Sequence, residues 1–140
     1  MSKIAVVYWS GTGNTEAMAK AVADGAKGSG AEVSLFGPSE FNSGMVSGFD
    51  AIAFGCPAMG SEVLEESEFD PMFTEVEPVL RGKKIAIFGS YGWGDGEWMR
   101  DWAGRCDAAG ANLASEPLTI NDAPDEDGLA DCRSLGAALV

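Results

Sequence analysis

Four apolar runs, separated by segments of helical periodicity, constrain the fold of this chain more than any other feature. The run at 3–9 is continuously apolar, which is typical of a strand buried on both faces of a parallel sheet, and the other three runs are interpreted as further strands. The runs are KIAVVYW at 3–9, EVSLF at 32–36, DAIAFGC at 50–56 and KKIAIFGS at 83–90. A fifth strand is expected within 112–121, with an interruption near Pro117.

The segments between the runs predict helices. Residues 15–27 place Met18, Ala21, Val22 and Gly25 on one helix face. Further helices are expected at 70–80, 97–109 and 125–140. The alternation of strands and helices predicts an α/β fold, with a parallel sheet covered by helices on both faces. The 140 residues show no repeat or linker, so residues 1–140 are expected to form a single domain.

Composition excludes several classes of protein. Hydrophobic residues make up 46% of the chain, which argues against disorder, and no apolar run reaches the roughly 20 residues of a membrane helix. The N-terminus lacks a signal-peptide pattern, so a cytoplasmic protein is expected. The net charge of −13 disfavours nucleic acid and anionic membranes as partners, and favours proteins with a basic patch. Acidity that only aids solubility remains an alternative.

The chain offers little for catalysis by side chains or for metal binding. It has no histidine, and its three cysteines form no C-x-x-C pair. We therefore expect no catalytic residues and no metal site, and we expect Cys56, Cys106 and Cys132 to be buried as small hydrophobic residues.

The loop SGTGNT at 10–15 follows the first apolar run and resembles a phosphate-binding turn without a cation. Its glycines allow close backbone approach, its side chains are hydrogen-bond donors, and the next helix adds oriented N–H groups. A Walker loop would need lysine where Asn14 stands, and a dinucleotide motif would need glycine at Glu16. A capped turn without a ligand remains an alternative.

Two further loops follow the third and fourth runs. CPAMGSE at 56–62 offers Met59 as a soft apolar surface, and SYGWGDGEW at 90–98 offers Trp93 between glycines. The first could be an ordinary loop and Trp93 a core residue, while Trp98 and Trp102 are expected mainly to pack. If the strand order is 2-1-3-4-5, the three loops meet and describe a site for a flat aromatic monophosphate.

At these residues the chain resembles the short-chain flavodoxins of clostridia and related anaerobes. The segments YWSGTGNTEAMA, GCPAMGSEVLEESEF and FGSYGWGDGEWMRDW carry the resemblance, which extends over nearly the whole chain. It implies a flavodoxin-like three-layer sandwich, with a five-stranded parallel sheet in the order 2-1-3-4-5, and non-covalently bound FMN.

The resemblance also implies a role for each loop. Met59 and Trp93 would cover the two isoalloxazine faces, and Trp9 would border the ribityl chain. The Gly60–Ser61 peptide would turn to accept from N5–H of the semiquinone, and Glu62 would accept from N3–H. The phosphate would be held by Ser10, Gly11, Thr12, Gly13, Asn14 and Thr15; the pyrimidine side would meet Ser90, Tyr91, Gly92 and Gly94; Pro57 and Ala58 complete the cofactor loop.

Two positions depart from the family pattern. Pro57 stands where some relatives have serine, and Ser61 stands where some have an acid beside the turning peptide. No contact is assigned to residues 120–126.

A low-potential one-electron carrier is the first hypothesis for function. It would shuttle between semiquinone and hydroquinone and serve redox partner enzymes with basic docking patches, as a monomer. An FMN-dependent NAD(P)H:quinone reductase is the alternative, although the chain has no arginine cluster for a 2′-phosphate. A signalling receiver domain would need acids where Trp9–Ser10 and Cys56–Pro57 stand.

Overall fold

The elements of the protein follow one another in the β-α order that the apolar runs predict. The computed structural model describes residues 2–11, 13–59, 63–92 and 94–140. In chain order the elements are β1 (Lys3–Tyr8), α1 (Asn14–Gly28), β2 (Glu32–Phe36), the 3₁₀ turns η1 (Pro38–Glu40) and η2 (Ser43–Gly48), β3 (Ala51–Gly55), α2 (Phe69–Val76), the 3₁₀ turn η3 (Glu77–Val79), β4 (Lys84–Tyr91), α3 (Glu97–Ala108), β5 (Asn112–Leu113), β6 (Leu118–Asn121) and α4 (Glu126–Ala138).

The sheet is parallel, and its strand order confirms the expectation of 2-1-3-4-5. The observed order is β2-β1-β3-β4-β5, and β6 also pairs with β4. The fifth position is therefore shared by two short strands, as the interruption expected near Pro117 predicts. Pro117 has no N–H to donate to a strand ladder, which makes it a natural point for the break. Beyond it, β6 resumes the pairing with Phe88 opposite Leu118 and Tyr91 opposite Asn121.

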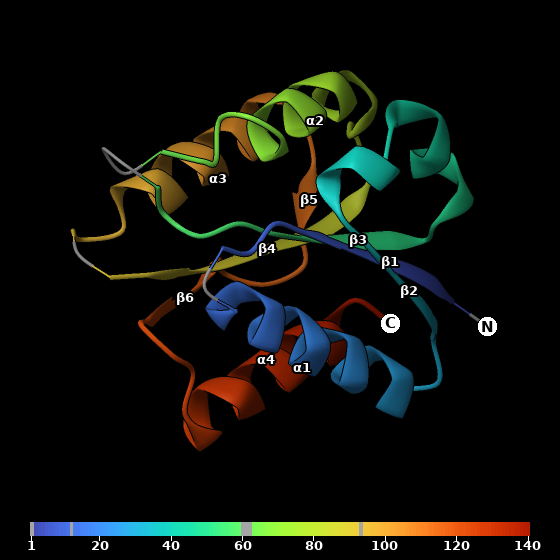
Figure 1. Ribbon diagram of the computed structural model, residues 1–140. Coiled ribbons are helices and arrows are strands. Elements are labelled where there is room, and N and C mark those ends of the chain that lie inside the picture. Colours follow the sequence, from blue (N-terminus) through green and yellow to red (C-terminus); the bar gives the residue numbers. More distant parts are fainter. Residues whose placement is uncertain (1, 12, 60–62, 93) are drawn as a thin grey trace.

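Helices cover both faces of the sheet, so the molecule has three layers (Figure 1). α2 and α3 lie on one face, and α1 and α4 lie on the other. Side chains alternate between the two cores because successive strand residues point to opposite faces. On β3, Ile52 and Phe54 join the core that contains the aromatic residues of α2 and α3, whereas Ala51 and Ala53 join the core of α1 and α4.

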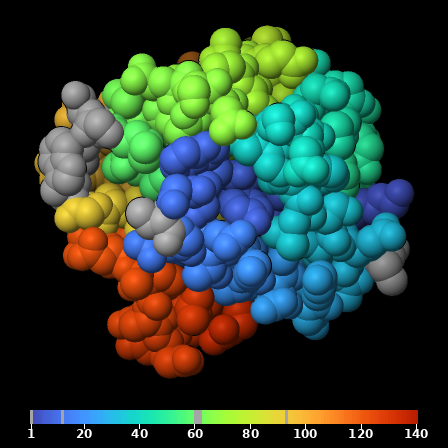
Figure 2. Space-filling model, in the orientation of Figure 1, coloured from blue at the N-terminus to red at the C-terminus, as the bar shows by residue number. Residues whose placement is uncertain are grey.

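Small residues allow α1 and α4 to pack very closely. A Cβ atom placed on Gly25 of α1 would lie 1.9 Å from the carbonyl oxygen of Arg133, and one on Gly136 of α4 would lie 1.9 Å from that of Val22. The space-filling view shows the residues of α1, in blue, beside the red residues of the C-terminal helix (Figure 2). This contact supports α1, whose N-terminus begins at one of the candidate loops.

Two segments differ from the sequence expectation. The helix predicted over 70–80 is α-helical only to Val76 and then tightens into a 3₁₀ turn at Glu77–Val79. Pro78 explains the change because its ring removes a backbone donor and clashes with the preceding helical turn. The 3₁₀ turns η1 and η2 were not expected; Phe41, directly after η1, and Val46, within η2, belong to the core that contains the aromatic residues. Within the described residues, no helix has the length and apolar character needed to cross a membrane.

Candidate functional site

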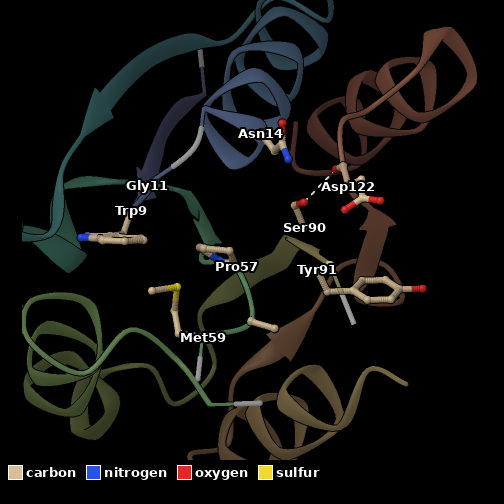
Figure 3. Close-up of a pocket in the computed structure, with 10 residues that line it drawn as sticks. Trp9, Gly11, Asn14, Pro57, Met59, Ser90, Tyr91 and Asp122 are labelled. Atoms are coloured by element: carbon tan, nitrogen blue, oxygen red, sulfur yellow. Dashed lines mark hydrogen bonds between the residues drawn. The ribbon is translucent and has the colours of Figure 1, made fainter. Parts of the chain in front are cut away.

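The loops that follow β1, β3 and β4 meet at the carboxyl edge of the sheet, where they form a pocket of about 230 Å³. Trp9 and Met59 lie on one side of the pocket, Ser90 and Asp122 lie on the other, and Pro57 lies between them (Figure 3). The full lining is Trp9, Gly11, Asn14, Pro57, Ala58, Met59, Ser90, Tyr91, Gly92 and Asp122. Nine of these ten residues are candidates from the sequence, and Asp122 is the addition.

The remaining candidates fall into two groups. Ser10, Gly13, Thr15 and Gly94 are described but do not line this pocket: the first two precede α1, Thr15 belongs to its first turn, and Gly94 precedes α3. The predictions made for Thr12, Gly60, Ser61, Glu62 and Trp93 lie outside the described residues.

The loop after β1 is organised by its own residues. Gly13 has φ of +96°, a backbone conformation that side chains rarely adopt, and it leads directly into α1. The Ser10 hydroxyl oxygen accepts from the N–H of Gly13 at 3.1 Å and from that of Glu16 at 3.2 Å. The Ser10 oxygen thus receives two donors, while its hydroxyl hydrogen can still be donated to an acceptor such as a ligand oxygen.

Thr15 provides a test of whether this loop fits an anion. The residue is 1% exposed, and its hydroxyl oxygen is buried without a hydrogen-bond partner among the described residues. A buried hydroxyl that lacks a partner costs free energy, and such groups in native proteins call for an explanation. An acceptor-rich ligand at the N-terminus of α1 would remove this cost. The residues present therefore fit a phosphate group, which needs donors and tolerates the absence of a cation.

The loop after β3 is fixed at both ends by backbone hydrogen bonds. Met59 and Val63 exchange N–H···O bonds of 2.8 and 3.0 Å, and the N–H of Ala58 donates to the Ser90 carbonyl at 3.0 Å. Trp98 is buried, as expected for a packing residue, and its indole N–H donates to the carbonyl of Cys56 at 3.1 Å. The loop that presents Met59 is therefore tied to β4 and to α3.

Asp122 forms the opposite wall and was not assigned a contact from the sequence. Its φ of +57° is unusual for a residue with a side chain. The conformation is held by a bond of 2.7 Å from the Asp122 N–H to the Tyr91 carbonyl, and by one of 2.8 Å from the Ser90 hydroxyl to the Asp122 carbonyl. The signal that could have found it is its position directly after the last strand, beside the carboxyl end of β4.

The electrostatics of the site are acidic. The loops at 9–13, 56–68 and 92–96 contain no lysine or arginine, whereas Glu65, Glu66, Glu68 and Asp95 stand within them. The Asp95 carboxylate accepts from Arg100 at 2.9 Å, and this bond lowers the pKa of Asp95. No positively charged side chain lines the pocket within the described residues.

The cysteines take no visible part in this chemistry. All three are buried and free, which confirms the expectation from the sequence. Burial raises the pKa of the Cys56 thiol and raises that of Cys132 to about 11, so both thiols stay protonated near neutral pH. What the site can do is hold a ligand: apolar walls suit a flat ring, and the donors before α1 suit a phosphate.

Comparisons with known proteins agree with this geometry. The flavodoxin family model matches residues 6–136. The flavodoxin of Clostridium beijerinckii is 47% identical over 134 residues, and that of Megasphaera elsdenii is 46% identical over 135; each alignment covers 96% of both chains. The solution structure of two-electron reduced Megasphaera elsdenii flavodoxin superposes with a TM-score of 0.88, at 45% identity and 97% coverage of both chains.

Proposed function

The chain belongs to the flavodoxin family, and we propose that it is a low-potential one-electron carrier that uses non-covalently bound FMN and shuttles between semiquinone and hydroquinone. The observation that carries this proposal is an apolar pocket that adjoins a set of hydrogen-bond donors and has no positively charged side chain among its described lining residues. Bound FMN would supply the redox chemistry, because a flavin can exchange electrons one at a time. The protein supplies binding, orientation and electrostatics.

The residues before α1 and in its first turn would anchor the cofactor phosphate. Ser10 and Thr15 offer hydroxyl donors, and the N-terminus of α1 offers oriented N–H groups and partial positive charge. A phosphate that does not react needs only this anchorage, so the lysine of a nucleotide-hydrolysing loop is not required. The pocket walls Trp9 and Met59 would exclude water from the ring beside them.

The charge of the chain would lower the potential of the second reduction step. A net charge of −13, and a pocket lining without a described cation, disfavour any further negative charge in the site. A one-electron couple shifts by about 59 mV for a tenfold change in relative binding. A penalty of roughly 3 kcal/mol against the reduced form would thus lower this potential by about 130 mV.

Stepwise reduction with dithionite, followed by visible spectroscopy, tests the proposal. We expect two well-separated steps, with a long-lived neutral one-electron form between them. A single two-electron transition, or a protein that stays colourless after FMN addition, would contradict the proposal of a one-electron carrier.

The charge distribution supports partners with basic docking patches. At the amino edge of the sheet, Lys3 begins β1, Lys84 begins β4, and Arg81 and Lys83 precede β4. The opposite edge, which holds the pocket, carries acidic loops without lysine or arginine. A basic partner is therefore drawn to the edge where the cofactor would bind. We expect electron transfer from a flavodoxin reductase to slow as salt is raised; a rate independent of salt would contradict this docking mode.

The quinone reductase alternative has a direct test. Steady-state oxidation of NAD(P)H by a quinone, catalysed by the purified chain without a partner reductase, would favour it over the carrier. The cytoplasmic location and the monomeric state remain predictions from the sequence, and size-exclusion chromatography checks the second.

A further inference from the structure

Glu65 is the one charged side chain that is buried among the described residues, and the function proposed above gives it no role. It is 6% exposed. It stands between the loop that presents Met59 and the start of α2, three residues after Glu62. Burying a carboxylate costs free energy unless hydrogen bonds replace its water, so its bonding shows what it holds together.

The carboxylate of Glu65 organises the turn that leads into α2. Its oxygens accept from the N–H groups of Ser67 at 2.8 Å, Glu68 at 2.8 Å and Phe69 at 2.9 Å, and from the Ser67 hydroxyl. Burial by itself would raise the pKa of Glu65, but these four bonds outweigh it and hold the pKa below its ordinary value. The residue is therefore an anionic acceptor at neutral pH.

The backbone of Glu65 closes the cofactor loop. Its N–H donates to the Cys56 sulfur at 3.3 Å, which joins residue 65 to the first residue of the 56–68 loop. Inside this closure, Met59 and Val63 exchange their two backbone bonds. This tie uses the backbone N–H of residue 65, and the carboxylate acts on it by holding that residue against the turn into α2. Because the side chain and backbone of Glu65 are both engaged, the position of α2 and that of Met59 are linked.

A second path leads from Glu65 to the other apolar wall of the pocket. The N–H of Glu68 is held by Glu65, and the Glu68 carboxylate accepts from the indole N–H of Trp9 at 3.1 Å. In Figure 3 this indole nitrogen points away from the pocket, while the ring borders it. A Cβ placed on Gly11 would lie 3.0 Å from the Trp9 ring, so the ring also covers the loop before α1.

We propose that Glu65 is a positioning residue for the cofactor pocket: one buried carboxylate fixes both Met59 and Trp9 before the ligand arrives. It acts through these residues and does not itself line the pocket. A pocket that is ordered in advance loses less entropy on binding. Loosening it weakens binding and alters the relative affinity for the oxidised and reduced cofactor, since the Met59 loop borders the ring. The inference rests on the proposed function for the identity of the ligand.

The test compares Glu65→Gln with Glu66→Gln. Both substitutions remove one negative charge from adjacent positions, but Glu66 is exposed. Glutamine at 65 keeps the shape and one oxygen, yet its amide NH₂ must face N–H donors and leaves bonds unmade. Relative to Glu66→Gln, we expect FMN binding by the apoprotein to weaken about tenfold in Glu65→Gln. We also expect amides in 56–59 and 63–69 to exchange faster with solvent, in the apoprotein as well as in the FMN complex.

Reduction potentials separate positioning from simple stabilisation. We expect the spacing between the two reduction steps to differ between the variants, and a tenfold change in relative binding corresponds to about 59 mV. Ser67→Ala is the milder variant: it removes one of the four bonds without changing charge, and should shift the same quantities in the same direction by less. If Glu65→Gln fails to fold, the FMN affinity and the step spacing of Ser67→Ala test the inference instead.

Two results would overturn the inference. In the first, Glu65→Gln lowers the free energy of unfolding but leaves FMN affinity and step spacing equal to those of Glu66→Gln; Glu65 then only caps α2. In the second, both glutamine variants shift alike, and charge alone is responsible. Failure of the proposed function looks different, because the unmodified protein would then show no FMN binding or no separated steps.

Discussion

The loop after β1 and the loop after β3 border the same pocket but are held in different ways. The first spans residues 9–13, leads at once into α1, and is closed by hydrogen bonds from its own Gly13 and from Glu16 to Ser10. The second spans 56–68 and depends on Ser90, Trp98 and the buried carboxylate of Glu65. The short loop is fixed by local bonds alone, whereas the long loop combines bonds of its own, made by Glu65, with partners from β4 and α3.

The largest expected effect comes from removing the support of the first loop. Gly25→Ala places a Cβ 1.9 Å from the Arg133 carbonyl oxygen and must push α1 away from α4. We expect a loss of about 3 kcal/mol in the free energy of unfolding. Gly104→Ala is the matched control in α3, where nothing lies within 4 Å, and should gain about 0.5–1 kcal/mol. Denaturant unfolding measures both, and equal effects would contradict close helix packing.

The next effect tests the anchor in the first loop. Thr15→Val replaces an unpartnered buried hydroxyl by a methyl group of similar shape. We expect the apoprotein to be unchanged or up to about 1 kcal/mol more stable, because the unsatisfied group is gone. FMN binding should weaken about 10- to 100-fold, the value of a hydrogen bond to a charged group. Riboflavin, which lacks the phosphate, should bind the unmodified protein and Thr15→Val equally well. If riboflavin binding weakened as much as FMN binding, Thr15 would not act through the phosphate.

An acid titration addresses the second loop. The pKa of Glu65 lies below its ordinary value of 4.5, so its bonds stabilise the protein above that pH, and this stability is lost as pH falls through the folded-state pKa. We expect Glu65→Gln to lack this part of the pH dependence, and to be roughly 1–2 kcal/mol less stable than Glu66→Gln near pH 7. Urea unfolding of both variants from pH 7 to pH 3 measures the free energy of unfolding and its pH dependence. Parallel curves for the two variants would mean that Glu65 bonds alike in the folded and unfolded chain.

The smallest effect separates charge from loop geometry. Asp122 belongs to neither loop but lines the pocket, so Asp122→Asn removes a charge without disturbing either closure. We expect about a twofold to fivefold gain in FMN affinity at low salt, which disappears near 1 M salt as screening takes over. Asp127→Asn, in the first turn of α4, is the control with the same charge change. An equal gain in both variants would assign the effect to net charge.

Most of the fold was predictable because its signals are local. The apolar run at 32–36 is β2 to the residue, and the small-residue pattern around Met18 and Val22 marks the buried face of α1. Pro117 correctly indicated the break between β5 and β6. The 3₁₀ turns at 38–40 and 43–48 were missed, because sequences of three and six residues have no period that distinguishes them from a loop.

The candidate site was predictable in part for the same reason. Gly11, Asn14 and Met59 follow strands, and parallel strands bring their carboxyl ends to one edge. Asp122 was missed since its backbone conformation is imposed by Tyr91 and Ser90, some thirty residues away in sequence. Glu65 was missed because a glutamate in an acidic stretch is usually solvated, and only its contacts show it to be buried.

The sequence by itself determined most of the strands and α-helices, the turn before α1 and the acidic character of the chain. These follow from backbone preferences and periodicity, which act over a few residues. Tertiary structure alone decided that Trp9 would reach Glu68, that Glu65 would bond to Cys56 and that the buried Thr15 hydroxyl would find no partner within the described part of the chain. Such contacts depend on how segments that are distant in sequence are brought together. Whether a polar side chain is buried, and whether it finds a hydrogen-bond partner, depends on all the residues that surround it in the fold.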